Sequence, residues 1–289
     1  MATVRDINRR IRSIQNTQQI TRAMKIVAAT KLRRAEANAR QGRPYADGMR
    51  EVLLVLRRHH APDLDPLMVD RGPGPACFVV VTADRGLCGS YNANVLRMAE
   101  AALRKEEAPL VIAVGRKARD YLRRRGYRLV AEYTGLGDEA RWEDARRVGE
   151  RVVALMRDGQ CAAVHLVFTK FVSTAVHRPQ VLQVLPLPET EAGRREGPAP
   201  LVLYEPSAEE VLRALLPRYV NTVLFHALLE SKASEHAARM IAMDSATENA
   251  QEMIDRLILE RNRARQAAIT REIIEIVSGA DALKKQGGV

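Results

Sequence analysis

The residues best placed to do chemistry stand in a short loop, Asp-Arg-Gly-Leu-Cys-Gly, at Asp84–Gly89. The loop follows an apolar run and precedes a helical stretch, which is where α/β enzymes bind their ligands. Cys88 could act as a nucleophile, but no histidine lies nearby in the sequence to activate it. The loop matches neither the G-x-x-x-x-G-K-S/T nor the G-x-G-x-x-G pattern of phosphate-binding loops. We therefore favour a structural turn or a contact with a partner protein over catalysis.

The other residue types that bind metals or attack substrates are scattered along the chain. The three cysteines are widely spaced, which predicts neither a disulfide framework nor a zinc site and favours a reducing compartment. The six histidines lack the spacing of metal ligands. The segment Gly115-Arg116-Lys117, after a second apolar run, is a weak candidate for binding an anion. The cysteines and histidines are Cys77, Cys88, Cys161, His59, His60, His165, His177, His226 and His236.

The elements that must position the loop alternate between strands and helices. This alternation is typical of an α/β layer with mostly parallel strand pairing. The last strand of the series is expected to return by a hairpin, and a surface linker is expected near 188–200. The expected strands are 76–82, 110–114, 127–133, 161–171 and 174–187, and the expected helices between them are 92–107, 116–125 and 139–158.

Residues 3–58 are expected to form one long helix. Ile7, Ile11 and Ile14 recur at helical spacing and form one apolar stripe. A second apolar group (Ile20, Met24 and Val27) lies roughly 120° away around the helix, at 100° per residue. Two apolar faces predict contacts with more than one partner, and a wide stripe in a helical bundle is the alternative. Proline at position 44 is expected to kink or interrupt this helix.

The chain returns to a helical pattern from about Ser207 to Leu283, with Ala and Ser recurring at spacings of three and four. Small residues let two helix backbones approach closely. At ~1.5 Å per residue, this helix reaches ~115 Å and the first one ~80 Å, too long for a compact domain. We therefore predict an antiparallel coiled coil of the two terminal helices flanking a central Rossmann-like α/β domain. The expected domains are 1–58, 59–206 and 207–289.

The C-terminal helix is longer than its expected partner. If both helices leave the domain together, the start of the chain lies opposite roughly residue 264, and the turns beyond it have no partner within the chain. A lone apolar helix in water aggregates, so this tip is expected to sit in a sleeve made by another protein. The apolar positions of the tip are Ala264, Ala267, Ala268, Ile269, Ile273, Ile274, Ile276 and Val277.

Composition and charge restrict the class of protein. The 289 residues contain no apolar run near the ~20 residues that span a bilayer, and the N-terminus lacks the features of a signal peptide. The net charge of +11 is unevenly distributed. Residues 1–58 carry 14 Lys or Arg against 4 Asp or Glu, whereas residues 207–289 carry 11 against 12. A basic helix is typical of proteins that bind nucleic acid, an anionic membrane or an acidic protein.

Four segments resemble the gamma subunit of F-type ATP synthases. They are Ile14–Ala29 in the first helix, Asp84–Gly89 with Asn92 in the central domain, and Met240–Asn249 and Asn262–Ala280 in the last helix. The segments are long, occur in the family's order and span the whole chain. The regulatory dithiol insertion of the plant plastid form is absent, which favours a bacterial type.

The resemblance implies a non-catalytic central-stalk rotor that couples proton flow through the membrane c-ring to ATP synthesis or hydrolysis in a ring of alpha and beta subunits. It implies further contacts with the epsilon subunit, a peripheral position on the cytoplasmic face of the bacterial cell membrane, and no catalytic residue, cofactor, metal or nucleic-acid partner. The implied rotor–stator contacts are Met24, Lys25, Arg265, Gln266, Thr270 and Glu272, and the implied central-domain loop near beta is Asp84, Arg85, Gly86, Leu87, Cys88 and Gly89.

Two other readings predict different behaviour. A nucleic-acid-binding scaffold built on the basic helix predicts aromatic stacking positions or a known module, and neither is present. A small α/β enzyme with helical arms predicts turnover by the isolated chain that is lost on Cys88→Ala or Asp84→Asn. An acidic protein sleeve around a basic shaft accounts best for the charge distribution. A thin shaft rich in Ala, Ile and Arg accounts for the low aromatic content of 4%.

Overall fold

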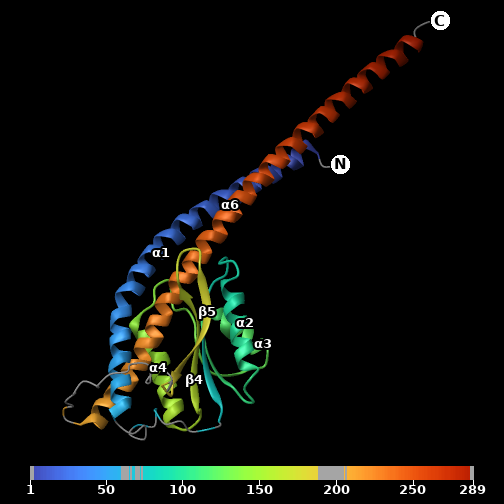
Figure 1. The fold of residues 1–289 in the computed structure, drawn as a ribbon. Coiled ribbons are helices and arrows are strands. Elements are labelled where there is room, and N and C mark those ends of the chain that lie inside the picture. Colours follow the sequence, from blue (N-terminus) through green and yellow to red (C-terminus); the bar gives the residue numbers. More distant parts are fainter. Residues whose placement is uncertain are drawn as a thin grey trace. The chain divides into compact units, whose positions relative to one another are not determined.

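The computed structural model describes residues 3–59, 65, 67–68, 72, 74–187, 205 and 207–286. The chain divides into two compact units, one formed by Met1–Ile26 with Ala242–Val289 and the other by Val27–Ile241. The helices and strands, labelled in Figure 1, are α1 (Val4–His59), β1 (Ala76–Val81), α2 (Tyr91–Leu103), β2 (Leu110–Val114), α3 (Arg116–Arg124), β3 (Arg128–Tyr133), α4 (Trp142–Arg157), β4 (Ala163–Phe171), β5 (His177–Leu185) and α6 (Ala208–Gln286).

A five-stranded sheet forms the centre of the second unit. Its order is β3-β2-β1-β4-β5, with parallel pairing throughout except for β5, which runs antiparallel to β4 after a hairpin. Every residue of β1 and β2 is buried, as expected for parallel strands that are covered on both faces. The predicted fold class, with its mostly parallel sheet and long terminal helices, is confirmed.

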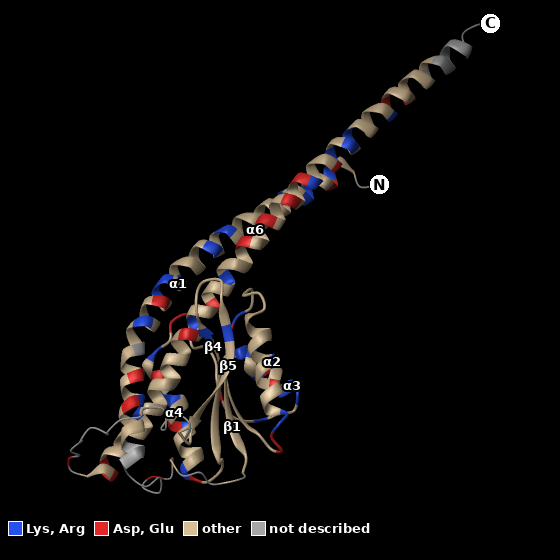
Figure 2. Ribbon diagram, viewed as in Figure 1, with Lys and Arg blue, Asp and Glu red and all other residues tan. Residues whose placement is uncertain are grey.

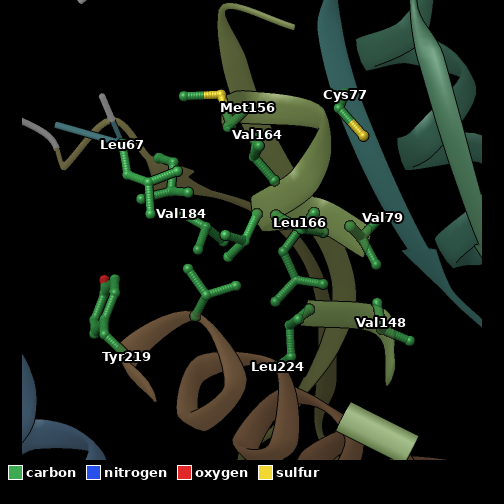
Figure 3. Packing of buried hydrophobic residues seen from close by; sticks show 14 of the residues in the cluster. Leu67, Cys77, Val79, Val148, Met156, Val164, Leu166, Val184, Tyr219 and Leu224 are labelled. Atoms are coloured by element: carbon green, nitrogen blue, oxygen red, sulfur yellow. The ribbon is translucent and has the colours of Figure 1, made fainter. Parts of the chain in front are cut away.

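The alternation of side chains along the strands divides the core into two layers. Phe78 and Val80 point toward α2 and α3 on one face, together with Val111 and Ala113 of β2. Cys77, Val79 and Val81 point to the other face, where they pack with α4 and α6. Figure 3 shows Tyr219 and Leu224 of α6 facing the strand residues Val184, Leu166 and Val79 across this second layer. The sheet is thus held directly against the long C-terminal helix.

Within the second unit, α1 and α6 pack against each other in antiparallel directions. Leu32 and Ala35 of α1 form a buried cluster with Ala233 and Ala237 of α6. Three of these four residues are alanine, which lets the two backbones approach closely. The Ala and Ser series predicted for this seam instead includes Ser234 and Ala238, which contact the α/β domain. The Ser234 hydroxyl donates to the Thr169 carbonyl oxygen of β4, and Ala238 packs with Cys88.

Within the first unit, α1 and α6 also run antiparallel. Gln18 bonds to Gln251, Thr21 to Thr247 and Lys25 to Asp244, so the residue numbers of each pair add to 268 or 269. Ile7 and Ile11 of α1 pack on Ile254 of α6, and all three are less than 10% exposed. The predicted antiparallel pairing is therefore present, with a polar stretch at Gln18–Lys25 next to an apolar one.

The helix α1 passes through Pro44 without ending, so the interruption that was one of the two outcomes expected there does not occur. A proline removes one backbone donor and costs about 3 kcal/mol, a loss that tertiary packing can offset. Among the described residues, no helix combines the length and the apolar character needed to cross a membrane.

Candidate functional site

The Asp84–Gly89 loop lies at the carboxyl edge of the sheet, where α/β proteins commonly bind ligands. The Asp84 carboxylate accepts hydrogen bonds from three backbone N–H groups. Arg116, the first residue of α3, donates at 2.9 Å, and Gly135 and Leu136, which follow β3, each donate at 3.0 Å. An aspartate of the chain itself thus takes the place in which an anionic ligand would bind a helix N-terminus.

Other side chains of the chain fill the remaining backbone bonding positions at this edge. The Thr82 hydroxyl accepts a hydrogen bond from the Ala118 N–H at 2.8 Å, and the Asn92 side-chain oxygen accepts one from Ala83 at 3.0 Å. Gly115 before α3 has a φ of 95°, and a Cβ there would stand 2.3 Å from the Thr82 carbonyl oxygen. The weak anion site predicted at Gly115-Arg116-Lys117 is therefore occupied by internal contacts.

Cys88 is unsuited to nucleophilic attack. It is 2% exposed and packs with Ala83, Tyr91 and Ala238. Burial raises the pKa of its thiol, and the thiolate is the reactive form of cysteine. The neighbouring Leu87 is instead 64% exposed. The loop thus turns an apolar side chain outward and its thiol inward, as in a surface that contacts a protein partner.

A buried polar network on α6 contacts this loop, and it was not predicted from the sequence. The Arg239 guanidinium donates to Glu235 Oε1 at 2.7 Å and to the Gly86 carbonyl oxygen at 3.4 Å. The Lys232 ammonium donates to Glu235 Oε2 at 3.2 Å and to the Gly137 carbonyl oxygen at 2.8 Å. The spacing 232, 235, 239 places three charged residues on one helix face, a signal that the sequence does contain.

His236 joins the same network. Its Nδ1 lies 3.3 Å from Arg239 Nη1, which can only donate, so Nδ1 accepts and Nε2 carries the proton. Nε2 then donates to the Asp138 carbonyl oxygen at 3.2 Å. Burial lowers the pKa of His236, which keeps the ring neutral. The Asp138 side chain in turn binds the Lys31 ammonium of α1 at 2.6 Å, and this cation lowers the pKa of Asp138.

The residues implied as rotor–stator contacts lie in the first unit, in two separate groups. Met24 and Lys25 are half-buried on α1, where Lys25 pairs with Asp244 at 2.5 Å. Residues near 265 lie 21 positions further along α6, about 30 Å away at ~1.5 Å per residue. The members of this second group, all exposed, are Arg265, Gln266, Thr270 and Glu272.

The tip of α6 carries a run of exposed apolar side chains. Ile269, Ile273, Ile274, Ile276 and Val277 are 49–66% exposed. Figure 2 shows that this last stretch of α6 carries few charged residues. Among the residues that the structure describes, no group of three or more His, Cys, Asp or Glu side chains is arranged to hold a metal ion.

Comparison with known proteins agrees with this organisation. A sequence model of the ATP synthase family matches residues 3–283. The ATP synthase gamma chain of Moorella thermoacetica is 50% identical over 285 residues, which cover 98% of this chain and 100% of the relative. This chain belongs to the family of ATP synthase gamma chains.

Chains in solved ATP synthase assemblies share the fold. A chain in the central stalk and c-ring of the Tetrahymena thermophila mitochondrial ATP synthase is 25% identical, with a TM-score of 0.59 over 78% of this chain and 99% of that one. A chain in an OSCP, F1 and c-ring assembly of the Euglena gracilis enzyme covers 99% of this chain and 96% of that one. Its TM-score is 0.69 at 18% identity, which is evidence for the fold alone.

Proposed function

We propose that this chain is the rotating central-stalk subunit of an F-type ATP synthase. In this role it couples proton flow through a c-ring to ATP synthesis or hydrolysis in a ring of alpha and beta subunits. The observation that carries the proposal is the match to gamma chains over 98% of the sequence, at 50% identity. A paired helical shaft with an exposed apolar tip is the structure that such a rotor requires.

The exposed tip supports a ring-shaped partner. A helix with five large apolar side chains in water is expected to aggregate unless another protein covers it. At 100° per residue these five side chains spread over roughly 160° of the helix circumference, so a single flat partner would leave part of them exposed. An enclosing sleeve of alpha and beta subunits covers them all. The basic first helix, with a net charge of +10 over residues 1–58, favours acidic segments in that sleeve.

We infer that the two groups of contact residues meet the sleeve at two levels. Met24 and Lys25 would meet the sleeve at one level, set by the pairing of Lys25 with Asp244. The second level lies about 30 Å further along α6 and comprises Arg265, Gln266, Thr270 and Glu272. The Asp84–Gly89 loop, with Leu87 exposed, would contact the beta subunits from the second unit. The epsilon subunit and the c-ring would bind the central α/β domain.

The role we propose is non-catalytic. The loop that could have held an active site binds its own Asp84 at the helix N-terminus, and the Cys88 thiol is buried with a raised pKa. Bond-making steps are therefore assigned to the alpha and beta subunits. We further propose the division into 1–58, 59–206 and 207–289, and a peripheral location on the cytoplasmic face of a bacterial cell membrane.

Co-expression with alpha and beta subunits from the same source tests the proposal. We expect a complex that contains all three chains and hydrolyses ATP, whereas the isolated chain hydrolyses nothing. A variant truncated after Thr270 should retain the folded α/β domain but lose assembly or coupling. Failure to co-purify, together with salt-dependent DNA binding by the chain, would instead favour the nucleic-acid scaffold.

A further inference from the structure

The helix α6 buries an unusual polar segment against the second unit. Between Glu230 and His236, six side chains are polar and all are buried. Glu235, Lys232 and Arg239 keep only 6%, 10% and 12% of their side-chain surface exposed. Burying such charges costs several kcal/mol per ion, and apolar side chains of similar volume often give equal or greater stability. Stability alone therefore does not account for this segment.

Lys232, His236 and Arg239 bind main-chain atoms of two loops at the carboxyl edge of the sheet. Arg239 donates to Gly86, in the loop after β1. Lys232 donates to Gly137, in the loop after β3, and His236 donates to the carbonyl of the next residue, Asp138. Each of these bonds has a defined direction, so rotation or sliding of α6 against the sheet would break all three together.

Asp138 connects the second long helix to the same point. Its carbonyl oxygen faces His236 of α6, and its carboxylate binds Lys31 of α1. The loop that carries Asp138 is in turn fixed to the loop after β1, because Asp84 accepts hydrogen bonds from Gly135 and Leu136. Polar contacts thus join both long helices and both loops into one continuous network.

The apolar contacts nearby cannot fix the helices in this way. At the same level α1 and α6 meet through Leu32, Ala35, Ala233 and Ala237. Apolar attraction is non-directional, so by itself it does not select one register of α1 against α6. Buried polar groups are best attested as devices that fix one register among several.

We propose that Lys31, Asp138, Lys232, Glu235, His236 and Arg239, here named the polar interlock, form the torque-bearing connection between the two long helices and the α/β domain. The proposal rests on the rotor function proposed above. In a rotor whose domain is driven from the membrane and whose helices turn inside a ring, torque must cross this boundary. The interlock holds the helices at a fixed angle to the sheet while it does so.

The test replaces the buried charges of the interlock by apolar groups in the complete, membrane-reconstituted complex. The variant is Lys232→Met/Glu235→Leu/Arg239→Met, and its matched control is Glu209→Leu/Arg213→Met, which removes an exposed ion pair of the same helix. The measurements are assembly with alpha and beta, ATP hydrolysis, and protons pumped per ATP hydrolysed. We expect the interlock variant to assemble and to hydrolyse ATP, but to pump roughly half as many protons per ATP or fewer. The control should pump normally.

A second pair of variants covers the case in which the triple variant does not fold. Lys31→Glu alone places two carboxylates together and should lower the pumping ratio, and Lys31→Glu/Asp138→Lys should restore it by reversing the pair. An unchanged ratio in the triple variant, or no rescue by charge reversal, would overturn the interlock. Absence of any complex with alpha and beta in the unmodified chain would overturn the proposed rotor function instead.

Discussion

The Asp84 carboxylate accepts a hydrogen bond from the backbone N–H of Arg116 at 2.9 Å, across the carboxyl edge of the sheet. In α/β enzymes this position, at the N-terminus of a helix that follows a strand, commonly receives the ligand's negative charge. Here the charge comes from the adjacent loop, and it also binds the segment after β3. A ligand-binding architecture is thereby used to hold three loops together.

Asp84→Asn is expected to destabilise the second unit by about 2 kcal/mol. Oδ1 could still accept from Arg116, but the amide nitrogen would replace the oxygen that accepts from Gly135 and Leu136. Two backbone donors would then face a third donor. Denaturant unfolding of the isolated chain measures the loss. Asp120→Asn, on the exposed side of α3, serves as the control and should leave the unfolding midpoint in place.

Cys88 should react slowly with maleimide in the folded chain. Its thiol is buried and its pKa is raised, so both access and thiolate content are low. A Leu87→Cys/Cys88→Ala variant places a thiol at the exposed neighbouring position and should react much faster. Comparable rates for the two chains, measured by mass spectrometry over a series of pH values, would contradict the buried position of Cys88.

The main elements of this fold could be predicted from the sequence because their signals are local. Apolar runs such as Leu110–Val114 mark buried strands, and the long stretches without turn residues mark α1 and α6. The antiparallel pairing followed from helix length, since two helices of this size find room only beside each other. The boundaries were less accurate, as at α4, which begins at Trp142 rather than at position 139.

The polar interlock was not predictable in the same way. Lys232, Glu235 and Arg239 read as an ordinary charged helix face, which is usually solvated. The loop partners of Lys232 and Arg239 are the carbonyl oxygens of Gly137 and Gly86, 95 and 153 positions away. Main-chain acceptors of this kind cannot be recognised from residue types. The same holds for Asp84, whose three donors are backbone N–H groups.

Gly115→Ala should cost about 3 kcal/mol of stability. The residue has a φ of 95°, and the new Cβ would stand 2.3 Å from the carbonyl oxygen of Thr82. Gly126→Ala is the matched control, because Gly126 has a φ of 78° but no atom within 4 Å of the added Cβ. It should cost only about 1 kcal/mol, the strain of the left-handed backbone. Equal losses in thermal unfolding would show that the contact with Thr82 is unimportant.

Ile11→Ala and Ile20→Ala should show which of the two apolar faces of α1 packs within the chain. Ile11 is 7% exposed and packs with Ile254, so its truncation should destabilise the paired helices by about 3 kcal/mol. Ile20 is 60% exposed, and its truncation should change their stability by less than about 0.5 kcal/mol. Thermal loss of helical circular dichroism measures both. A larger loss for Ile20 would show that the exposed face also packs within the chain.

Stability of the second unit should fall as the pH drops below the ordinary histidine pKa of 6.5, with His236 as one cause. Burial lowers the pKa of His236 in the folded chain, so below that pH the unfolded chain binds a proton that the folded chain does not. The contribution is fully present above 6.5 and is lost as the pH falls toward the folded pKa, with a slope of at most about 1.4 kcal/mol per pH unit. Arg239 and Lys232 would also repel the protonated His236 ring, although Glu235 would attract it.

His236→Gln tests this assignment, because an amide can donate to the Asp138 carbonyl and accept from Arg239 without titrating. The variant should lose less stability between neutral and mildly acidic pH than the unmodified chain. Part of the pH dependence should persist, since burial also lowers the pKa values of His165 and His177. Denaturant midpoints measured at several pH values give the slope for each chain. Identical slopes would show that His236 does not contribute to the pH dependence of folding.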